Sequence, residues 1–317
     1  MNKRVYGVLG ISSIMANWNA DFSGFPKTTS DGTTYGSDKA LKYPMKKMWD
    51  NQGKKVIYIK SMCFESGGKG EANLIPRTLK ERYEHVFQAT IQKKGNDSKK
   101  ILQNLFTAID VKNFGATFAE AGANISITGV VQFGQGFNKY DGTVPQEQSI
   151  LSPFRDPSAK EKNTDGEEAK NSTLGTKIVS NEAHYFYPFS INPQAYQEFV
   201  ALGVTEGYTE ADYTEFKQAA ITAVTAYATN AKAGCENEFA LFVETKSDTY
   251  LPCLDEYIEF KKGEEKNTIL LGAIPAMLED MRVGILAVEV YYNPYTTDIS
   301  EKIKGAKYFN ILTQKEI

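Results

Sequence analysis

VYGVLGI, residues 5–11, is an apolar and β-branched run that predicts a buried first strand. The polar residues 12–35, rich in Asn, Asp, Gly, Ser and Thr, predict a long loop after it. A helix is expected next, over residues 37–51, with Ser37 as its N-cap and Gly53 just beyond its end. A strand, a long loop and a helix in this order open an α+β fold.

The rest of the chain continues this alternation. Further strands are predicted at residues 55–64, 124–133, 178–191, 238–245, 258–261 and 283–292, and helices at 78–94, 98–109 and 208–232. Residues 138–177 carry three prolines and no sustained period, which is typical of a functional loop or an insertion. The order fits a single α+β domain: an RRM-like (ferredoxin-like) sheet with helices on one side, interrupted by insertions.

Composition excludes several classes of protein. With 41% hydrophobic and 24% charged residues, the 317-residue chain can bury a core. No run approaches the roughly 18 apolar residues of a membrane helix, and the N-terminus is interpreted as a strand rather than a signal peptide. Three widely spaced cysteines and two histidines suit neither a disulfide framework nor a zinc site, so a reducing cytoplasm is expected.

Charge is distributed unevenly along the chain. Residues 1–112 hold 19 Lys and Arg against 10 Asp and Glu, whereas the remainder holds 17 against 29. A net charge of −3 alone argues against nucleic acid, but a basic first third is compatible with a nucleic-acid site there. Chance variation along a chain is the alternative explanation.

The predicted helix at residues 37–51 concentrates part of this charge. At about 100° per residue, Lys39, Lys42 and Lys46 fall within about 60° of one another. Three apolar residues face the other way: Leu41, Met45 and Met48. Such a lysine row can follow a phosphate backbone, although an ordinary solvated face has the same pattern. Pro44 requires either a kink or a later helix start.

Two other segments could contact a ligand. Residues 16–27, ANWNADFSGFPK, combine amides, a carboxylate, aromatics and a lysine, which can contact phosphates and stack on bases. The alternative is an Asx-turn loop whose polar groups only satisfy its backbone. Residues 132–136, QFGQG, could let a ligand approach exposed backbone N–H groups, or could form a simple turn.

Catalytic signatures are missing from the sequence. There is no GxSxG elbow and no evident Cys/His pair, and His184 is expected to pack in the core. Asp21 and Asp110 are isolated acids, too few to specify a metal site. We therefore expect a binding protein without cofactor, metal or catalytic residues.

Short blocks in a fixed order resemble one family. NWNADFSGFPK and the helix opening GSDKALKYPMKK are the most specific, and DVKNFG, SITGVVQFG and KAGCENEF follow them up to about residue 245. Together they resemble the Cas7 family of CRISPR-associated proteins, in particular its type I-B (DevR-like) subgroup.

The resemblance implies an RRM-like palm over residues 1–317, with a helical fingers insertion at 65–110 and a β-hairpin thumb insertion at 138–177. It also implies a backbone subunit of the Cascade complex whose copies stack head to tail along the guide RNA (crRNA). The thumb kinks the guide, which stays available to pair with target DNA in antiviral defence or guided transposition. The other implied partners are a large subunit, a cap on the five-prime handle and a repeat-processing endonuclease.

The resemblance also suggests which residues bind RNA. They are Asn19, Asp21, Lys27, Ser37, Lys39, Lys42, Lys46, Lys47, Gln132, Phe133, Gly134 and Lys232. The wedge residue of the thumb is unassigned, with Leu151, Phe154 and Leu174 as guesses.

Two other functions stay open at this point. Related subunits of type III complexes cut target RNA with a loop aspartate and a divalent ion, and Asp21 occupies a comparable loop. A carbohydrate- or protein-binding module is the third hypothesis, based on the aromatic residues 185–189.

Overall fold

The computed structural model describes residues 1–66, 71–92, 95, 97–120, 122–151 and 174–317. Its largest sheet is centred on β1 (Lys3–Ala16), which pairs antiparallel with β10 (Leu174–Ile191) and with β11 (Cys235–Lys246). Gly7 in β1 is required by close packing. A Cβ there would lie 2.1 Å from the carbonyl oxygen of Leu241 and 2.5 Å from the Phe189 ring.

The sheet continues on both sides of these three strands. β14 (Ile285–Tyr292) pairs antiparallel with β11, and β16 (Lys307–Asn310) pairs parallel with β14. Beyond β10 lie the short strands β7 (Val131–Phe133), β8 (Gly136–Asn138) and β2 (Tyr35–Gly36). The central order is therefore β14, β11, β1, β10 and β7, with every neighbouring pair antiparallel.

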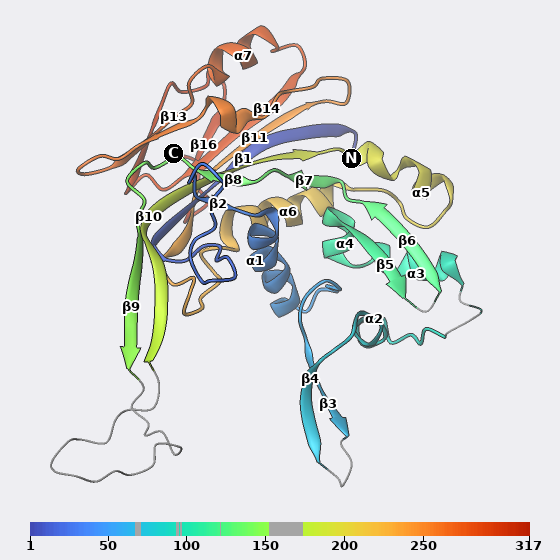
Figure 1. Cartoon of the computed structure of the whole chain (residues 1–317). Helices are drawn as coiled ribbons and strands as arrows, with labels where there is room; N and C mark the ends of the chain where they lie inside the picture. Colours follow the sequence, from blue (N-terminus) through green and yellow to red (C-terminus); the bar gives the residue numbers. More distant parts are fainter. Residues whose placement is uncertain (67–70, 93–94, 96, 121, 152–173) are drawn as a thin grey trace, which may run out of the picture.

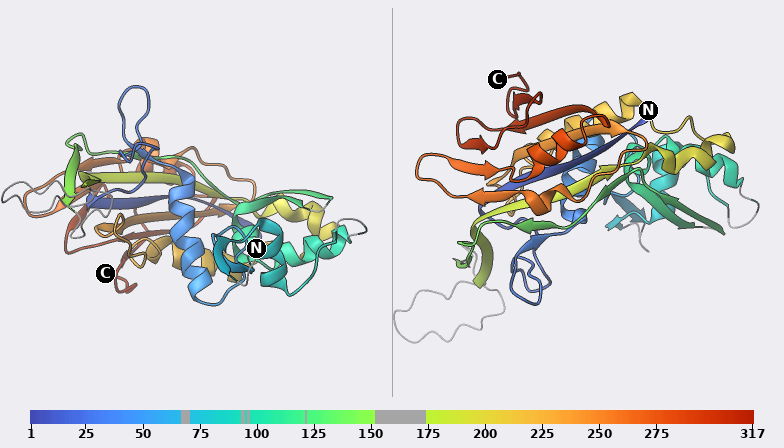
Figure 2. Two further views of the ribbon diagram at one scale, coloured as in Figure 1. Left: turned by 60° about the horizontal axis from the view of Figure 1, so that its bottom comes forward. Right: turned by 90° about the horizontal axis from the view of Figure 1, so that it is seen from above.

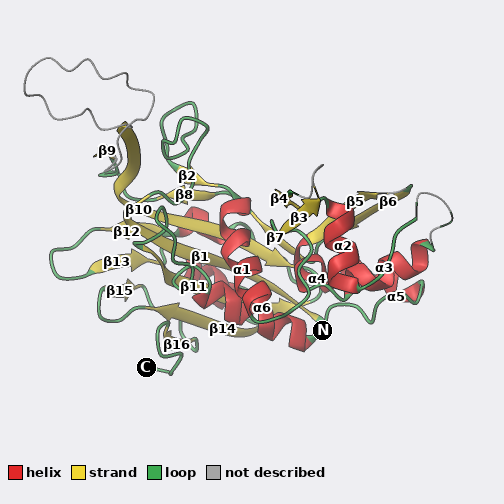
Figure 3. Cartoon of the chain, turned by 90° about the horizontal axis from the view of Figure 1, so that it is seen from below, coloured by secondary structure: helices red, strands yellow, loops and turns green. Residues whose placement is uncertain are grey.

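Two helices cover one face of this sheet (Figure 1, Figure 3). They are α1 (Asp38–Asn51) and α6 (Glu210–Thr222). The core between the helices and the sheet includes Val5, Leu9, Leu41, Met45 and Phe216. Since successive strand residues face opposite sides, the alternate β1 residue Val8 is left for a second core.

A C-terminal layer covers part of the opposite face. It consists of β12 (Glu259–Lys261), β13 (Asn267–Leu270), β15 (Thr297–Ser300), α7 (Ile274–Asp280) and a short 3₁₀ helix, η3 (Leu254–Tyr257). Its core includes Val8, Phe186, Leu241, Ile269 and Ile274. The sheet is thus buried between helices on one side and this layer on the other.

The remaining elements lie at the two ends of the sheet (Figure 2). One end carries two hairpins, β3 (Met62–Ser66) with β4 (Ala72–Pro76) and β5 (Gly115–Glu120) with β6 (Ala123–Thr128). It also carries the helices α2 (Leu79–Phe87), α3 (Ser98–Phe106), α4 (Ile109–Phe114) and α5 (Gln197–Ala201), and the 3₁₀ helix η2 (Pro193–Tyr196). At the other end, β9 (Pro145–Leu151) pairs with the first half of β10 as a projecting hairpin.

Much of the predicted secondary structure is confirmed. The chain is α+β, the strands expected at 5–11, 178–191 and 238–245 are present, and α1 begins after Ser37. Pro44 lies inside α1, buried against the core, so the helix does not start later there. No helix in the described part of the chain is long and apolar enough to cross a membrane.

Three predicted elements are wrong in extent. Residues 55–61 form no strand, because the Asp110 carboxylate takes the N–H groups of Ile57 and Tyr58. The strand expected at 124–133 divides into β6 and β7 around Gly129, where a Cβ would lie 2.2 Å from the backbone of Phe114. The helix expected to reach 232 ends at Thr222.

Two sequence expectations concern the insertions. Within 138–177, residues 145–151 and 174–177 form paired strands, and residues 152–173, including Phe154, lie outside the described residues. Within 65–110 the two expected helices are present but shorter, as α2 and α3.

Candidate nucleic-acid interface

The loop between β1 and α1 is held in shape by its own polar side chains. The carboxylate of Asp21 accepts hydrogen bonds from the backbone N–H groups of Ser23 (2.8 Å) and Phe25 (3.0 Å). The side-chain amide of Asn17 donates to the carbonyl of Ile178 in β10 (3.1 Å). Asp21 therefore orders the loop as an Asx turn. Among the described residues, no three His, Cys, Asp or Glu side chains lie close enough together to hold a metal ion, so Asp21 belongs to no such group there.

Asn19 connects this loop to the start of α1. Its side-chain oxygen accepts from the N–H of Ser37 (2.9 Å), and its carbonyl accepts from the N–H of Lys27 (2.9 Å). Ser37 Oγ in turn accepts from the N–H of Ala40 (3.3 Å) and caps the helix. The structure thus brings three predicted site residues together at one end of α1.

Lys232 supports the loop from behind. Its ammonium group donates to the carbonyl oxygens of Asn17 (2.8 Å) and Trp18, and lies 5.1 Å from the centre of the Trp18 ring. Burial lowers the pKa of Lys232. Lys232 was predicted to bind RNA, but its ammonium group is directed at two carbonyl oxygens of the β1–α1 loop. It therefore stabilises the conformation of this loop.

The lysine row of α1 lines one pocket of about 300 Å³. Lys39, Lys42 and Lys46 all face it, which confirms the prediction that they share one side of the helix. The other wall is formed by Tyr58, Phe114, Gly115, Ala116, Thr117 and Ile127. This lysine pocket therefore lies between α1 and the base of the β5–β6 hairpin.

The three lysines differ in how free their charges are. Lys39 is exposed. Lys42 forms an ion pair with Asp38 (2.8 Å), and its ammonium group lies 5.3 Å from the centre of the Phe114 ring. Lys46 donates to the carbonyl of Tyr58 (3.1 Å), and burial lowers its pKa. Lys39 is consequently the most available for an anionic ligand, whereas Lys42 faces the pocket with its charge already shared with Asp38.

Lys47 does not face the lysine pocket. It forms an ion pair with Asp50 at 3.0 Å, one turn further along α1. The same Asp50 also binds the guanidinium of Arg82 in α2 (2.9 Å). The structure therefore separates Lys47 from the other three predicted lysines.

Asp110 lies at the bottom of the lysine pocket, 2% exposed. Its carboxylate accepts from the N–H of Ile57 (3.0 and 3.1 Å) and of Tyr58 (2.7 Å). Burial raises the pKa of the Asp110 carboxyl, against the lowering effect of these hydrogen bonds and of Lys46. Asp110 holds the backbone that positions the Tyr58 ring in the pocket wall.

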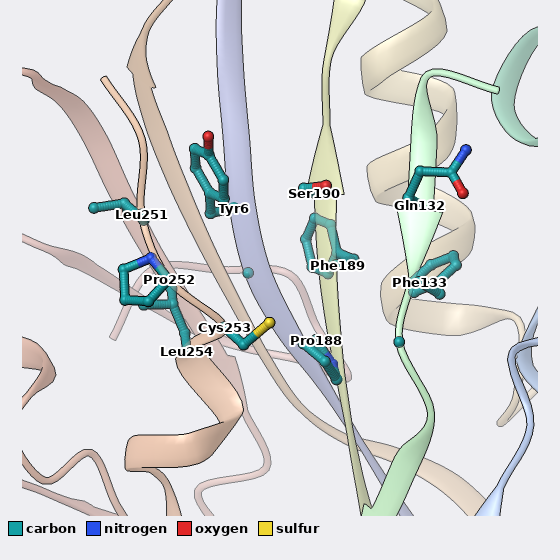
Figure 4. Close-up of a pocket in the computed structure, with 12 residues that line it drawn as sticks. Tyr6, Gln132, Phe133, Pro188, Phe189, Ser190, Leu251, Pro252, Cys253 and Leu254 are labelled. Carbon is teal, nitrogen blue, oxygen red and sulfur yellow. The ribbon is translucent and has the colours of Figure 1, made fainter. Parts of the chain in front are cut away.

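Residues 132–134 line a different pocket, of about 290 Å³, on the other side of the sheet (Figure 4). Across it lie Tyr6 and residues 251–254. The N–H of Gly134 donates to the carbonyl of Pro188 (2.9 Å), so the expectation of a free N–H for a phosphate is wrong there. Only Phe133 approaches the lysine row, its ring centre lying 6.0 Å from the ammonium group of Lys42.

The aromatic residues 185–189 form no binding face. Tyr185, Phe186, Tyr187 and Phe189 are at most 4% exposed, which removes the basis of a carbohydrate- or protein-binding module. The third hypothesis is therefore corrected. These rings belong to the two cores on either side of β10.

His184 is a core residue, as predicted, and its imidazole lies between two carboxylates. Its Nδ1 contacts the Glu238 carboxylate (2.8 and 2.9 Å), and its Nε2 contacts Glu182 (3.0 Å). Lys262 adds a 2.6 Å ion pair to Glu182, and the imidazole stacks on Phe260 at 3.8 Å. Burial alone would lower the pKa of His184, but the two carboxylates outweigh it and raise it.

Sequence reasoning missed three residues of this surface. Tyr58 was assigned to a strand, and Phe114 and Asp110 had no pattern that linked them to the lysines. Their proximity depends on the β5–β6 end of the molecule folding against α1.

Leu151, a guessed wedge residue, is 59% exposed on β9, and Leu174 is its pairing partner on β10.

Comparison with known proteins gives a family and a fold. The family model described as CRISPR-associated protein Cas7 matches residues 3–271. A chain of a "CRISPR RNA-guided surveillance complex, pre-nicking" is 15% identical with a TM-score of 0.56, over 97% of this chain and 96% of that one. A chain of another "CRISPR RNA-guided surveillance complex" is 15% identical with a TM-score of 0.45, over 93% and 95%. No curated protein sequence matches significantly.

Proposed function

We propose that this chain, which belongs to the Cas7 family of CRISPR-associated proteins, binds guide RNA as a non-catalytic backbone subunit of a type I surveillance complex. The observation that carries the proposal is the lysine pocket, where Lys39 and Lys42 face the same space beside the ordered β1–α1 loop. An array of ammonium groups on a rigid helix binds phosphates and gains free energy from counterion release.

The architecture supports an RRM-like palm. Four strands lie side by side in the order β11, β1, β10 and β7, and every neighbouring pair is antiparallel. Along the chain, α1 lies between β1 and β7, and α6 lies between β10 and β11. Both helices pack on the same face, as in a ferredoxin-like fold. The whole chain would be one palm domain with two insertions.

The insertions have assigned roles in the proposal. Residues 65–110, with α2 and α3, would be the fingers, and residues 138–177 would be the thumb that wedges between nucleotides. The projecting β9–β10 hairpin supports the thumb assignment, since a hairpin that leaves the sheet can reach a neighbouring copy. Leu151 is our candidate wedge because it is exposed at the described end of β9.

We further propose that copies of the chain line up head to tail on one guide, together with a large subunit, a five-prime-handle cap and a repeat-processing endonuclease. Presenting stacked guide bases for pairing with target DNA would serve antiviral defence and guided transposition alike. The type I-B subgroup is our assignment from the sequence blocks at residues 17–27 and 36–47.

A metal-dependent ribonuclease is the competing function. It would need the Asp21 carboxylate to hold a divalent ion, but Asp21 already accepts two backbone hydrogen bonds that shape its own loop. This arrangement favours the binding role.

The first test is the absorbance ratio at 260 and 280 nm of the protein purified at moderate salt, with its size-exclusion profile before and after RNase treatment. A high ratio and large particles that shrink on RNase treatment would support assembly on RNA. A clean protein ratio would contradict the proposal if the monomer is also unchanged by added guide RNA and the partner subunits together.

A further inference from the structure

Phe22 is the most exposed large apolar side chain in the described part of the chain. Its relative exposure is 112%, against 79% for Val283 and 73% for Phe64. Its neighbours in sequence, Asp21 and Ser23, are exposed and polar. The ring is therefore fully in water and contributes to neither core of the protein.

The backbone that carries Phe22 is rigid. The Asp21 carboxylate accepts from the N–H groups on either side of the turn, at Ser23 and Phe25. The N–H of Asp21 also donates to the carbonyl of Phe25 (2.7 Å), and the Asn17 amide donates to the carbonyl of Gly24 (2.9 Å). The ring therefore projects from a fixed turn and loses little conformational entropy when it binds something.

The turn is also fixed relative to two elements of the proposed RNA site. Asn19 binds the N–H of Ser37, one residue before α1 and two before Lys39. Asn17 binds the carbonyl of Ile178, near the base of the β9–β10 hairpin. In Figure 1 the loop lies beside the beginning of α1 and the β9–β10 hairpin, so a chain of nucleotides along the lysine row would pass it.

We infer that Phe22 is a stacking platform for one unpaired nucleobase of the bound RNA, an inference that rests on the proposed function. Aromatic rings stack on every base, because each base has a π face, so the contact tolerates any guide sequence. A protein partner fits less well. A stable interface buries about 800 Å² on each side, whereas one phenylalanine ring surrounded by polar residues offers at most about 250 Å².

The test compares two single-stranded RNAs of equal length, an oligouridylate and a fully abasic chain with the same phosphates. Full-length Phe22→Ala should bind the oligouridylate about 5- to 150-fold more weakly than the unaltered protein does. It should bind the abasic chain equally well, because the lysine contacts remain. Phe64→Ala, which removes another exposed ring on β3, should change neither affinity.

A second variant reports the contact directly. The only native tryptophans, Trp18 and Trp49, are at most 1% exposed, so Phe22→Trp adds the single solvent-facing indole. Its fluorescence should be quenched by the oligouridylate and not by the abasic chain.

The outcomes separate the two hypotheses. If the unaltered protein binds neither RNA, even with the partner subunits present, the proposed function fails. If it binds both and Phe22→Ala binds them equally well, only the stacking role is wrong. A blue shift of the new indole on self-association without RNA would overturn the inference in favour of a protein contact.

Discussion

The buried carboxylate of Asp110 accepts a 2.7 Å hydrogen bond from the backbone N–H of Tyr58, across 52 residues of chain. Lys46 on α1 donates to the carbonyl of the same residue (3.1 Å). One peptide segment is therefore held from both sides, and its ring forms a wall of the lysine pocket. The geometry of the proposed phosphate-binding surface thus depends on a buried acid and a partly buried lysine.

Replacing Lys39 and Lys42 together by alanine should weaken RNA binding for all sequences alike. The logarithm of affinity should also fall less steeply with the logarithm of salt, by about 1.4, because each single-strand phosphate contact contributes about 0.7. Affinity measured at four salt concentrations checks this. Alanines at Lys304 and Lys315, both exposed in the C-terminal region, are the matched control and should leave the slope unchanged. An unchanged slope in the Lys39/Lys42 variant would remove these lysines from the RNA site.

Asp110→Asn should destabilise the protein by about 1–3 kcal/mol, because an amide N–H₂ would face a backbone N–H in a buried position. Urea unfolding measures the loss of free energy. Asp97→Asn is the control, since Asp97 caps α3 at an exposed position and asparagine caps a helix equally well. Equal stability of the two variants would show that Asp110 does not hold the Ile57–Tyr58 backbone.

His184 should make stability depend on pH. Its folded pKa is raised above the unfolded value of 6.5 by Glu238 and Glu182, so its contribution is complete below pH 6.5 and disappears as pH rises through the folded pKa. The advantage of the unaltered protein over His184→Gln should therefore shrink between pH 6 and pH 9 in urea unfolding. His85→Gln, at the exposed second histidine, should show no such trend. A constant difference across this range would mean that the histidine is not charged in the fold.

Two substitutions at Asp21 distinguish a structural carboxylate from a catalytic one. Asparagine keeps the acceptor for the Ser23 and Phe25 N–H groups, so Asp21→Asn should bind RNA nearly normally, whereas Asp21→Ala should loosen the loop and bind more weakly. Incubation of the assembled complex with complementary RNA and magnesium provides the second readout. Cleavage by the unaltered complex that both variants abolish would establish the ribonuclease function instead.

Gly36→Ala should destabilise the protein by about 1–3 kcal/mol through overpacking. A Cβ there would lie 1.8 Å from the hydroxyl oxygen of Tyr187 and 2.5 Å from Trp18 Nε1, the two atoms of a buried hydrogen bond. Thermal unfolding with Gly175→Ala as control tests this, because the nearest atom to a Cβ at Gly175 is 3.8 Å away. Equal melting temperatures would mean that this contact relaxes freely.

Several features of the fold could be predicted because they depend on neighbours in sequence. The apolar and β-branched run VYGVLGI predicts β1, and Ser37 with the 3.6-residue spacing of the lysines predicts α1 and its two faces. The apolar pattern of residues 55–64 predicts a strand, but residues 55–61 form none. The N–H groups of Ile57 and Tyr58 donate instead to Asp110, about fifty positions later in the chain, and a local pattern does not reveal such a partner.

For the candidate site, the sequence by itself determined the residue types: a polar loop, a row of lysines on one helix face, and the short blocks of a family. Only the tertiary structure decided which of these charges are available. Lys46 and Lys232 are directed at backbone carbonyls, Lys42 at Asp38 and Lys47 at Asp50, which leaves Lys39 as the exposed lysine of the pocket. The reason is physical. Whether an ammonium group is free depends on which acceptors other segments bring within about 3 Å, and local periodicity does not encode that distance.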